Sequence, residues 1–519
     1  MLKLQKVVDF SFVKTLRRHR LWADALCFIA GGVTVAAFAP YHLAPFALIG
    51  PSVLFMAWES APNASRFALR GYFYGLGLFG FGVSWLYNSL SLFGEAIAPL
   101  AGPLTALFVA FLALIPALMG WIAWRFMPLP RSLRLLLVWP ALWVLFEWLR
   151  SWLFTGFPWL LLGDSQVGFA PGALAPLFGT LGVSGFLALL GGLLALAAFE
   201  RRFLPRMLAV FLIPTLWFVS GALAGIRWTH PDGLPFRVSL IQGNISQQRK
   251  FDPQEFTQIL QRYQNMTIKH LGSRLIIWPE TAVPTLFRYV QSDYLQPLAR
   301  VLTHHRGDLI TGIFREQEGR IYNAVVSMGA SSTEFYFKHH LVPFGEYMPL
   351  PHWLGRLYRF MHVPMSNLSA GHGGFVIHAA GIPIGVSVCY EVAYETLVRK
   401  SLPKAKLLIN VSNDAWFGDS SEPYQQLQMA RMRALEFGRY MLVAMNTGPS
   451  AIIAPNGHIV ALGERGKAVA LTAEVRPMGG VTPFTRWGEW PMIGTAWLIV
   501  LGAAAGVWRR RFNKKTQGV

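Results

Sequence analysis

The segment Ser387-Val388-Cys389-Tyr390-Glu391 follows a β-branched run and places a cysteine directly after a predicted strand. Two other predicted strands end in residues that suit the same chemistry, at Trp278-Pro279-Glu280 and at Phe337-Lys338-His339-His340. A thiol becomes a useful acyl carrier when a base and a positive charge lie near it. The three segments therefore predict one site built from strand ends, with Cys389 as its nucleophile.

The composition around these segments indicates a membrane protein. Of 519 residues, 53% are hydrophobic and only 14% are charged. Runs long enough to cross the roughly 30 Å hydrocarbon core occur near 21–38, 42–57, 72–89, 98–124, 133–149, 177–199, 206–225 and 490–507. Between 230 and 480 the sequence has no such run. We therefore predict three parts: seven helices in 1–229, a soluble domain in 230–480, and a last helix with a basic tail in 481–519.

The distribution of Lys and Arg predicts the orientation. Basic residues lie at the N-terminus, in the linkers around Arg66, Arg131 and Arg202, and in the tail at 509–515. The intervening connections are nearly free of them. Both termini are thus expected in the cytoplasm and the large domain on the opposite side. The basic stretch before the first run lacks a cleavage site, which predicts an uncleaved first helix.

The formal net charge of +20 does not indicate nucleic-acid binding, because most of it lies at helix edges where anionic lipid headgroups attract it. The two cysteines do not predict a disulfide, since Cys27 lies within the first helix and Cys389 in the soluble domain. An unpaired thiol in an exported domain favours a reactive role for Cys389.

The soluble domain alternates short strands with helices, which predicts helices covering a mixed sheet. A turn at Pro455-Asn456-Gly457-His458 predicts a hairpin. The predicted strands are 237–242, 275–278, 308–313, 323–328, 334–339, 384–388, 407–412, 441–446 and 451–454. The predicted helices are 253–270, 291–305, 392–400 and 422–438.

The Glu, Lys and Cys at strand ends, in that order, resemble the nitrilase superfamily, whose fold is an αββα sandwich. Six shorter segments resemble the apolipoprotein N-acyltransferase family more specifically, and they are 242–244, 278–281, 343–347, 389–391, 413–418 and 430–434. The resemblance implies a membrane α-helical bundle of about eight transmembrane helices plus a nitrilase-like α/β domain. Two positions depart from the expected pattern: Phe251 replaces a Trp, and Val443 replaces an Arg.

Each triad candidate has an alternative structural interpretation. Cys389 is predicted as the nucleophile, although free cysteines are often small buried hydrophobes. Glu280 is predicted as the general base, although an acid after a Trp-Pro turn also stabilises a helix start. Lys338 is predicted to lower the thiol pKa and stabilise an oxyanion, although lysine is common on edge strands.

Three residues are predicted as supporting groups. Glu346 and Glu391 are candidates for orienting Lys338 through a charged hydrogen bond, and Glu391 alternatively buttresses its own turn. Tyr390 is expected to pack under an acyl chain, to donate a hydrogen bond, or to serve as a core aromatic. The histidine spacings match no metal-ligand pattern, so neither a metal nor another cofactor is expected.

The stretch 350–368 interleaves aromatic and basic residues, which are favoured at a membrane interface. We predict a lipid-contacting arm, with a core-packing insertion as the alternative. The arm candidates are Trp353, Leu357, Tyr358 and Phe360.

The resemblance implies a two-step transfer in the bacterial inner membrane by a monomer with a periplasmic catalytic domain. A membrane phospholipid donates an acyl chain to Cys389, and the α-amine of a diacylglyceryl-modified apolipoprotein accepts it. One rival is a membrane-tethered amidase, but a tether needs only one helix. The other is a transporter with a sensing domain, but few ionisable residues, such as Asp24 and Glu147, lie within the helices.

Overall fold

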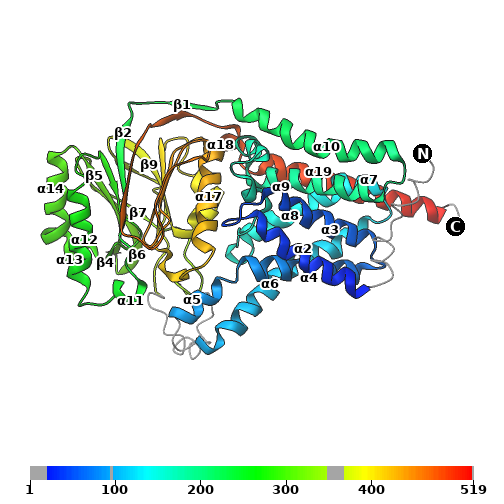
Figure 1. Cartoon of the computed structure of the whole chain (residues 1–519), viewed down its shortest axis with the longest axis horizontal. Helices are drawn as coiled ribbons and strands as arrows, with labels where there is room; N and C mark the ends of the chain where they lie inside the picture. Colours follow the sequence, from blue (N-terminus) through cyan, green and yellow to red (C-terminus); the bar gives the residue numbers. More distant parts are fainter. Residues whose placement is uncertain (1–19, 94–97, 348–366, 517–519) are drawn as a thin grey trace. The chain divides into compact units, whose positions relative to one another are not determined.

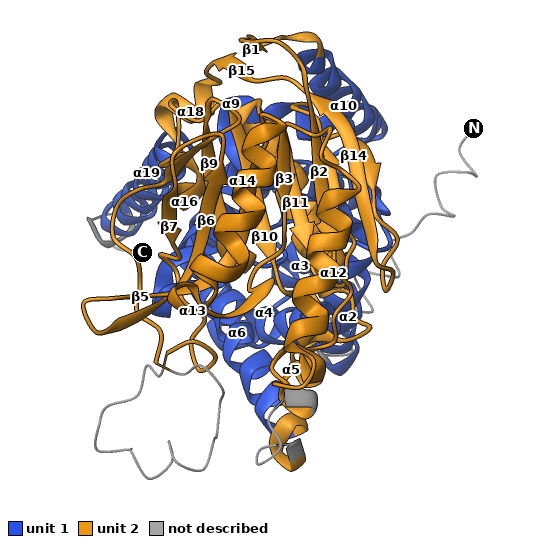
Figure 2. Cartoon of the chain, turned by 90° about the vertical axis from the view of Figure 1, so that its left-hand side faces the viewer, with its two compact units in different colours: residues 1–84, 103–224, 489–519 blue, residues 85–102, 225–488 orange. Residues whose placement is uncertain are grey.

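The computed structural model describes residues 20–93, 98–347 and 367–516. It divides into two compact units, coloured separately in Figure 2. Unit 1 comprises 1–84, 103–224 and 489–519, and unit 2 comprises 85–102 and 225–488. The assignment of 85–102 to unit 2 is a feature that composition did not predict.

Unit 1 is helical (Figure 1). Within the described residues, five helical segments are long and apolar enough to cross a membrane: Ala101–Phe126, Arg131–Thr155, Ala170–Phe199, Phe203–Gly225 and Trp490–Asn513. Two shorter apolar helical segments, Leu21–Ala37 and Ala44–Glu59, precede them. With α4 (Ala64–Gly82) they account for the expected membrane bundle of about eight helices.

Close helix contacts in this unit occur at glycines. On α2 (Arg20–Thr34), Gly31 lies against the backbone of Tyr74 on α4, and Gly77 of α4 lies against the carbonyl of Phe28. A β-carbon at either glycine would overlap with the facing backbone. Small residues therefore allow α2 and α4 to approach closely, as is common in membrane helix pairs.

The two acids noted within the helices have structural partners. Asp24 accepts a hydrogen bond from Arg66 at 2.7 Å. Glu147 accepts hydrogen bonds from the indole of Trp143 and from the backbone N–H of Leu162, both at 2.9 Å. Both acids thus bind groups of unit 1 itself, which weakens the transporter interpretation.

The third helix differs from the predicted span 72–89. It begins earlier, because Asn63 caps its first turn by accepting from the N–H of Arg66. The charge of Arg66 is neutralised by Asp24, a pairing that a hydropathy pattern does not register. The helix ends at Gly82, and a separate helix, α5 (Leu86–Phe93), follows in unit 2.

Unit 2 contains two large sheets. The strands of the seven-stranded sheet are, in order, β14 (Val469–Val475), β2 (Phe236–Gln242), β3 (Leu275–Ile277), β5 (Asp308–Gln317), β6 (Arg320–Gly329) and β7 (Glu334–Phe337), with β4 (Val283–Leu286) beside β5. Those of the six-stranded sheet are β13 (Ile459–Leu462), β12 (Ala451–Ile453), β11 (Met441–Met445), β10 (Leu407–Ser412), β9 (Ile382–Val388) and β8 (Val376–Ala379).

The two sheets face each other, and helices cover their outer sides (Figure 1). Side-chain alternation along the strands explains the layers. Leu275 and Ile277 of β3 lie in the cluster between the sheets, whereas Ile276 packs outward against α12 (Phe256–Ile268) and α14 (Gln296–His304). On the other sheet, Leu408 packs outward against α17 (Glu422–Phe437). The predicted αββα sandwich is therefore confirmed.

The strand directions bring the predicted site residues to one edge of each sheet. β3 is parallel to β5, and β7 runs the same way because both pair antiparallel with β6. Glu280 and Lys338 thus follow strands that end at the same edge. β9 and β10 are parallel, so Cys389 and Asn413 also share an edge.

All nine predicted strands are present, with boundaries shifted by a few residues, and the predicted hairpin joins β12 to β13. Four strands of the two large sheets were not predicted, namely β4, β8, β13 and β14, and β6 begins three residues earlier than predicted. Their exposed positions dilute the apolar alternation on which the prediction depended.

Candidate active site

Cys389 lies at a sharp change of backbone direction. It ends β9 with φ of 56°, in the left-handed region, and opens the short helical turn η13 (Cys389–Ala393). Two residues next to predicted site glutamates have similar conformations: Thr281, which follows Glu280, with φ of 50°, and Phe344, two residues before Glu346, with φ of 62°. Such conformations are unfavourable for residues with a β-carbon and concentrate at functional sites.

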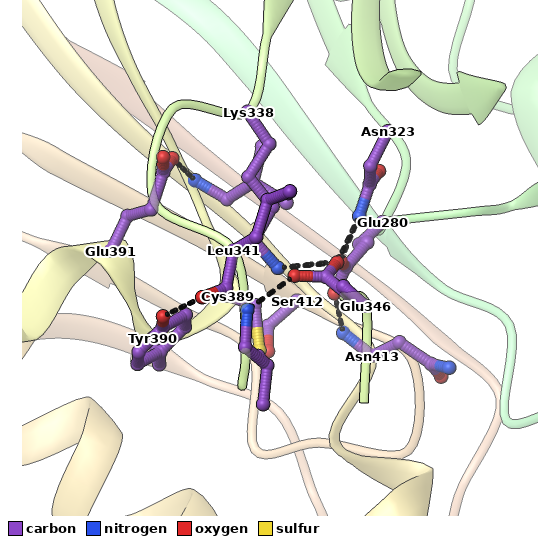
Figure 3. A network of polar contacts seen from close by, with 12 residues as sticks. Glu280, Asn323, Lys338, Leu341, Glu346, Cys389, Tyr390, Glu391, Ser412 and Asn413 are labelled. Atoms are coloured by element: carbon purple, nitrogen blue, oxygen red, sulfur yellow. Dashed lines mark hydrogen bonds and ion pairs between the residues drawn. The ribbon is translucent and has the colours of Figure 1, made fainter. Parts of the chain in front are cut away.

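The centre of the site is an ammonium held by two carboxylates (Figure 3). The Nζ atom of Lys338 lies 2.8 Å from Oε1 of Glu346 and 3.5 Å from Oε1 of Glu280. Lys338 is only 1% exposed. The structure thus brings together Glu280, Lys338 and Glu346, and the sulfur of Cys389 lies beside this cluster in Figure 3.

Two asparagines fix the carboxylates. The side-chain amide of Asn323 donates to Oε1 of Glu280 at 2.7 Å and to Oε1 of Glu346 at 3.0 Å. The backbone N–H of Asn413 donates to Oε2 of Glu280 at 2.9 Å. The backbone N–H of Val342 donates to Oε2 of Glu346 at 2.8 Å. Both carboxylates are therefore oriented by neutral donors as well as by the cation.

The electrostatics of the resting site favour a neutral thiol and a charged lysine. Burial raises the pKa of the Cys389 thiol, Glu280 raises it further, and Lys338 lowers it. Lys338 thus acts in the predicted direction, but the net effect on the thiol pKa is the opposite. Burial alone would lower the pKa of Lys338, but Glu346 and Glu280 outweigh it and raise that pKa. A nucleophilic role for Cys389 therefore requires a base that removes the thiol proton.

Glu391 fastens the turn that carries Cys389. Its Oε1 atom accepts from the backbone N–H groups of His339 and His340, at 2.8 and 2.9 Å. Its Oε2 atom accepts from the N–H of Val388 at 2.8 Å and from the hydroxyl of Tyr336 at 2.7 Å. This carboxyl does not orient Lys338 directly. It ties the Cys389 turn to the segment that follows Lys338.

The buried Glu391 carboxyl predicts a pH-dependent stability. Burial raises the pKa of this carboxyl from 4.5 to about 7. The hydrogen bonds that the carboxyl accepts lower the pKa, but burial outweighs them. The folded state therefore holds a proton that the unfolded state loses, and the free energy of unfolding falls as pH rises from about 4.5 to about 7. This contribution is on the order of 3 kcal/mol.

In Glu391→Gln this contribution to the pH dependence of the free energy of unfolding is expected to disappear. The protein is also expected to be less stable, because the amide nitrogen of glutamine is a donor and would face the donors that now bind a carboxyl oxygen. Unfolding of the purified protein at pH 5 and pH 8 would measure both effects. Glu474→Gln, the same change at an exposed position of β14, serves as the control. An unchanged slope in Glu391→Gln would contradict the assignment.

The remaining predicted residues have different outcomes. The hydroxyl of Tyr390 donates to the carbonyl of Leu341 at 2.7 Å, and Nζ of Lys338 lies 5.5 Å from the Tyr390 ring centroid. The arm candidates lie outside the described residues: Trp353, Leu357, Tyr358 and Phe360. In the part of the chain that the structure describes, no group of three or more His, Cys, Asp or Glu side chains is placed to hold a metal ion.

The two departures from the family pattern lie in different environments. Phe251 is 39% exposed and follows Lys250, whose ammonium donates to the backbone carbonyl of Glu280 at 3.2 Å. Burial lowers the pKa of Lys250 to about 8. Val443 is fully buried in the cluster between β11 and α17. The first departure thus borders the site, and the second contributes to packing behind it.

Sequence reasoning missed several groups around Glu280, Lys338 and Cys389. Asn323, Ser412 and Lys250 are all less than 4% exposed, and each contacts Glu280 or Cys389. A polar side chain within a predicted buried strand was the available signal for Asn323 and Ser412. Lys250 carried no such signal, because the basic stretch around it resembles a solvated turn.

A segment from the N-terminal half of the sequence also reaches this region of unit 2. The indole of Trp85 donates to Oε1 of Gln425 at 3.1 Å, and the amide of Asn88 donates to the carbonyl of Phe417 at 3.3 Å. Trp85 and Phe417 also make an edge-on ring contact at 5.1 Å. The turn η14 (Asp414–Phe417), which follows Asn413, is thus held by residues just before and within α5.

The αββα sandwich with its strand-end cluster defines a nitrilase-like domain, and the model of the carbon-nitrogen hydrolase family matches residues 237–479. The model of the apolipoprotein N-acyltransferase N-terminal domain matches residues 30–193. The chain belongs to the apolipoprotein N-acyltransferase family.

Full-length relatives support this assignment. The apolipoprotein N-acyltransferase of Methylococcus capsulatus is 45% identical over 90% of this chain and 93% of its own length. Those of Coxiella burnetii and Nitrosomonas europaea are each 38% identical, over 92% and 93% of this chain and 99% and 97% of their own lengths. The similarity thus extends through both the apolar helices and the nitrilase-like domain.

Proposed function

We propose that this protein transfers a fatty acyl chain from a membrane phospholipid, through a thioester on Cys389, to the α-amine of a diacylglyceryl-modified apolipoprotein. The observation that carries the proposal is the buried ammonium of Lys338, held by Glu280 and Glu346 beside an unpaired thiol. Membrane helices in the same chain supply access to lipid substrates. No metal or other cofactor is required by this chemistry.

In the first half-reaction Sγ of Cys389 attacks the ester carbonyl carbon of the phospholipid. Glu280 takes the thiol proton, and Lys338 stabilises the negative charge on the carbonyl oxygen. The carbon–oxygen ester bond then breaks. The departing glycerol oxygen takes the proton from Glu280, which releases a lysophospholipid and leaves a thioester on Cys389.

In the second half-reaction the neutral α-amine of the acceptor attacks the thioester carbonyl carbon. Glu280 takes a proton from the attacking nitrogen, and the carbon–sulfur bond breaks. The thiolate of Cys389 recovers its proton from Glu280, and the product is an amide. An α-amine suits this step, because its ordinary pKa of about 7.7–8.0 leaves a useful neutral fraction at physiological pH.

Intact mass of the protein purified from membranes tests the covalent intermediate. We expect an added fatty-acyl mass that neutral hydroxylamine removes, because hydroxylamine cleaves thioesters. Release of ammonia from small soluble amides, without acyl addition, would instead support a tethered amidase. The proposal would also fail if purified protein incubated with phospholipid and acceptor peptide produced no lysophospholipid.

We also propose an inner-membrane location with a periplasmic catalytic domain and both termini in the cytoplasm. The support is the concentration of Lys and Arg in alternate connections. Reporters fused near Arg66, Arg131 and Arg202 are expected to report cytoplasm, and one fused within 237–478 the opposite side. A cytoplasmic signal from that domain would overturn the orientation.

A further inference from the structure

Glu422, the first residue of α17, carries a buried carboxyl group. It is 1% exposed, and within the residues that the structure describes neither Oε1 nor Oε2 has a hydrogen-bonding partner. Its own backbone N–H is directed at Ser420 Oγ at 3.4 Å. Burying a carboxyl without partners costs free energy, so such groups are rare and concentrate at functional sites.

Glu422 lies on the face of α17 that is directed toward the nucleophile. Gln426 follows it by four residues, one helical turn, and therefore shares its face. Gln426 accepts from the hydroxyl of Ser412 at 3.4 Å and donates to Asn410 at 3.1 Å. Asn410 donates to the carbonyl of Cys389 at 2.9 Å, and the Ser412 hydroxyl hydrogen-bonds the Cys389 thiol.

The charge of Glu422 affects the pKa of the Cys389 thiol. When ionised, Glu422 raises the pKa of Cys389, although less than burial and Glu280 do. Burial also raises the pKa of Glu422 itself, Asp414 raises it further, and Arg465 lowers it. Burial and Asp414 therefore favour the neutral acid over the carboxylate in the free enzyme, and a neutral Glu422 does not oppose formation of a thiolate at Cys389.

The cations near this face already have partners. Arg465 binds Asp419 at 3.0 Å and the carbonyl of Ser420 at 3.1 Å. Lys338 binds Glu346 and Glu280. A positive partner for Glu422 is therefore most simply supplied by a substrate.

Of the two substrates, the acceptor carries such a cation at its reacting atom. The phospholipid reacts at a neutral ester carbonyl. The acceptor reacts through an α-amine that is largely an ammonium at neutral pH. Its nitrogen must approach the carbonyl carbon bonded to Sγ of Cys389. We propose that Glu422 binds the acceptor's α-amine for the second half-reaction, an inference that rests on the proposed function.

Every proton in this step has a defined donor and acceptor. As the α-ammonium binds, the proton of Glu422 leaves to solvent and an ion pair forms. One ammonium N–H bond then breaks and an O–H bond forms on Glu422, which frees the nitrogen lone pair for attack. The second amine proton passes through Glu280 to the departing thiolate of Cys389. Glu422 ends the cycle as the neutral acid with which it began.

Glu422→Gln keeps the size of the side chain but can neither form the ion pair nor take the proton. Its thioester is expected to form at least as fast as in the wild type. The KM for a diacylglyceryl peptide is expected to rise about 10- to 100-fold, the effect of losing one charged hydrogen bond. Glu422→Asp is expected to recover part of this loss, because it restores the carboxylate.

Cleavage of the isolated acyl-enzyme by hydroxylamine separates this role from a structural one. Hydroxylamine is neutral at pH 7 and needs no carboxylate, so Glu422→Gln and wild type are expected to be cleaved at the same rate. Glu474→Gln, the same change at an exposed position, should leave the KM for acceptor unchanged.

An unchanged KM for the acceptor in Glu422→Gln would overturn the inference. A parallel slowing of hydroxylamine cleavage and of peptide transfer would also overturn it, because that result indicates a disturbed site. Absence of a thioester in the wild-type protein would instead refute the proposed function itself. The two failures are therefore distinguishable in one set of measurements.

Discussion

Cys389→Ala is expected to abolish both thioester formation and transfer to the acceptor. Cys389 is the one thiol of unit 2, and its turn is fixed by Glu391 beside the Lys338 ammonium. Alanine removes the proposed nucleophile with little change in volume, so the fold is expected to persist. Intact mass should show no added acyl chain, and transfer to a lipopeptide should fall to background.

Two variants sharpen this experiment. Cys389→Ser retains a hydroxyl, but an alkoxide is harder to form than a thiolate and an ester is harder to pass to an amine, so overall transfer should also be lost. Cys27→Ala removes the other thiol, which lies in α2 of unit 1, and should retain activity. Full N-acylation of lipoprotein by Cys389→Ala would refute the covalent mechanism.

Lys338→Ala is expected to prevent accumulation of the thioester. The change leaves Glu280 and Glu346 facing each other without the ammonium that now lies 3.5 and 2.8 Å from them. It also removes the cation that we propose stabilises the tetrahedral oxyanion, an interaction worth about 10²- to 10³-fold in rate in other acyl-transfer enzymes. Single-turnover acylation with phospholipid, followed by mass, measures the effect.

Lys406→Ala provides the matched control for this change. Lys406 forms an ion pair with Asp232 at 2.8 Å, and both side chains are substantially exposed, so its loss should change little. Glu280→Gln should match Lys338→Ala in failing to accumulate thioester. If Lys338→Ala becomes acylated normally yet does not transfer, Lys338 acts in the second half-reaction and the assignment given above is wrong.

The alternation of short apolar strands with helices predicted helices that cover a mixed sheet, and the resemblance to the nitrilase superfamily implied the αββα sandwich. Ile384–Val388 before Cys389 and the run before Glu280 are examples of such strands. Strand direction then follows from the crossover helices, which bring the strand ends to common edges. The order of Glu, Lys and Cys along the chain carried the resemblance, and the resemblance implied which strand ends meet.

The environment of those ends was not predictable in the same way. The net rise in the pKa of Cys389 depends on burial, which residue order does not reveal. The role of Asn323 depends on two glutamates distant in sequence becoming neighbours. The start of α4 was misplaced because Asp24, forty-two residues before Arg66, neutralises a charge that otherwise indicates a loop.

The contacts of Trp85 and Asn88 affect which fragment of the chain would contain the whole catalytic unit. A fragment limited to residues 225–488 would omit both, although they belong to the same compact unit as the sandwich. It would leave Phe417 and Gln425 without the partners that hold them at 3.3 and 3.1 Å, close to the residue that orients Glu280. The compact unit that holds the nitrilase-like domain therefore includes a part encoded between two helices of the first half, and a domain excised or grafted onto another anchor would lack it.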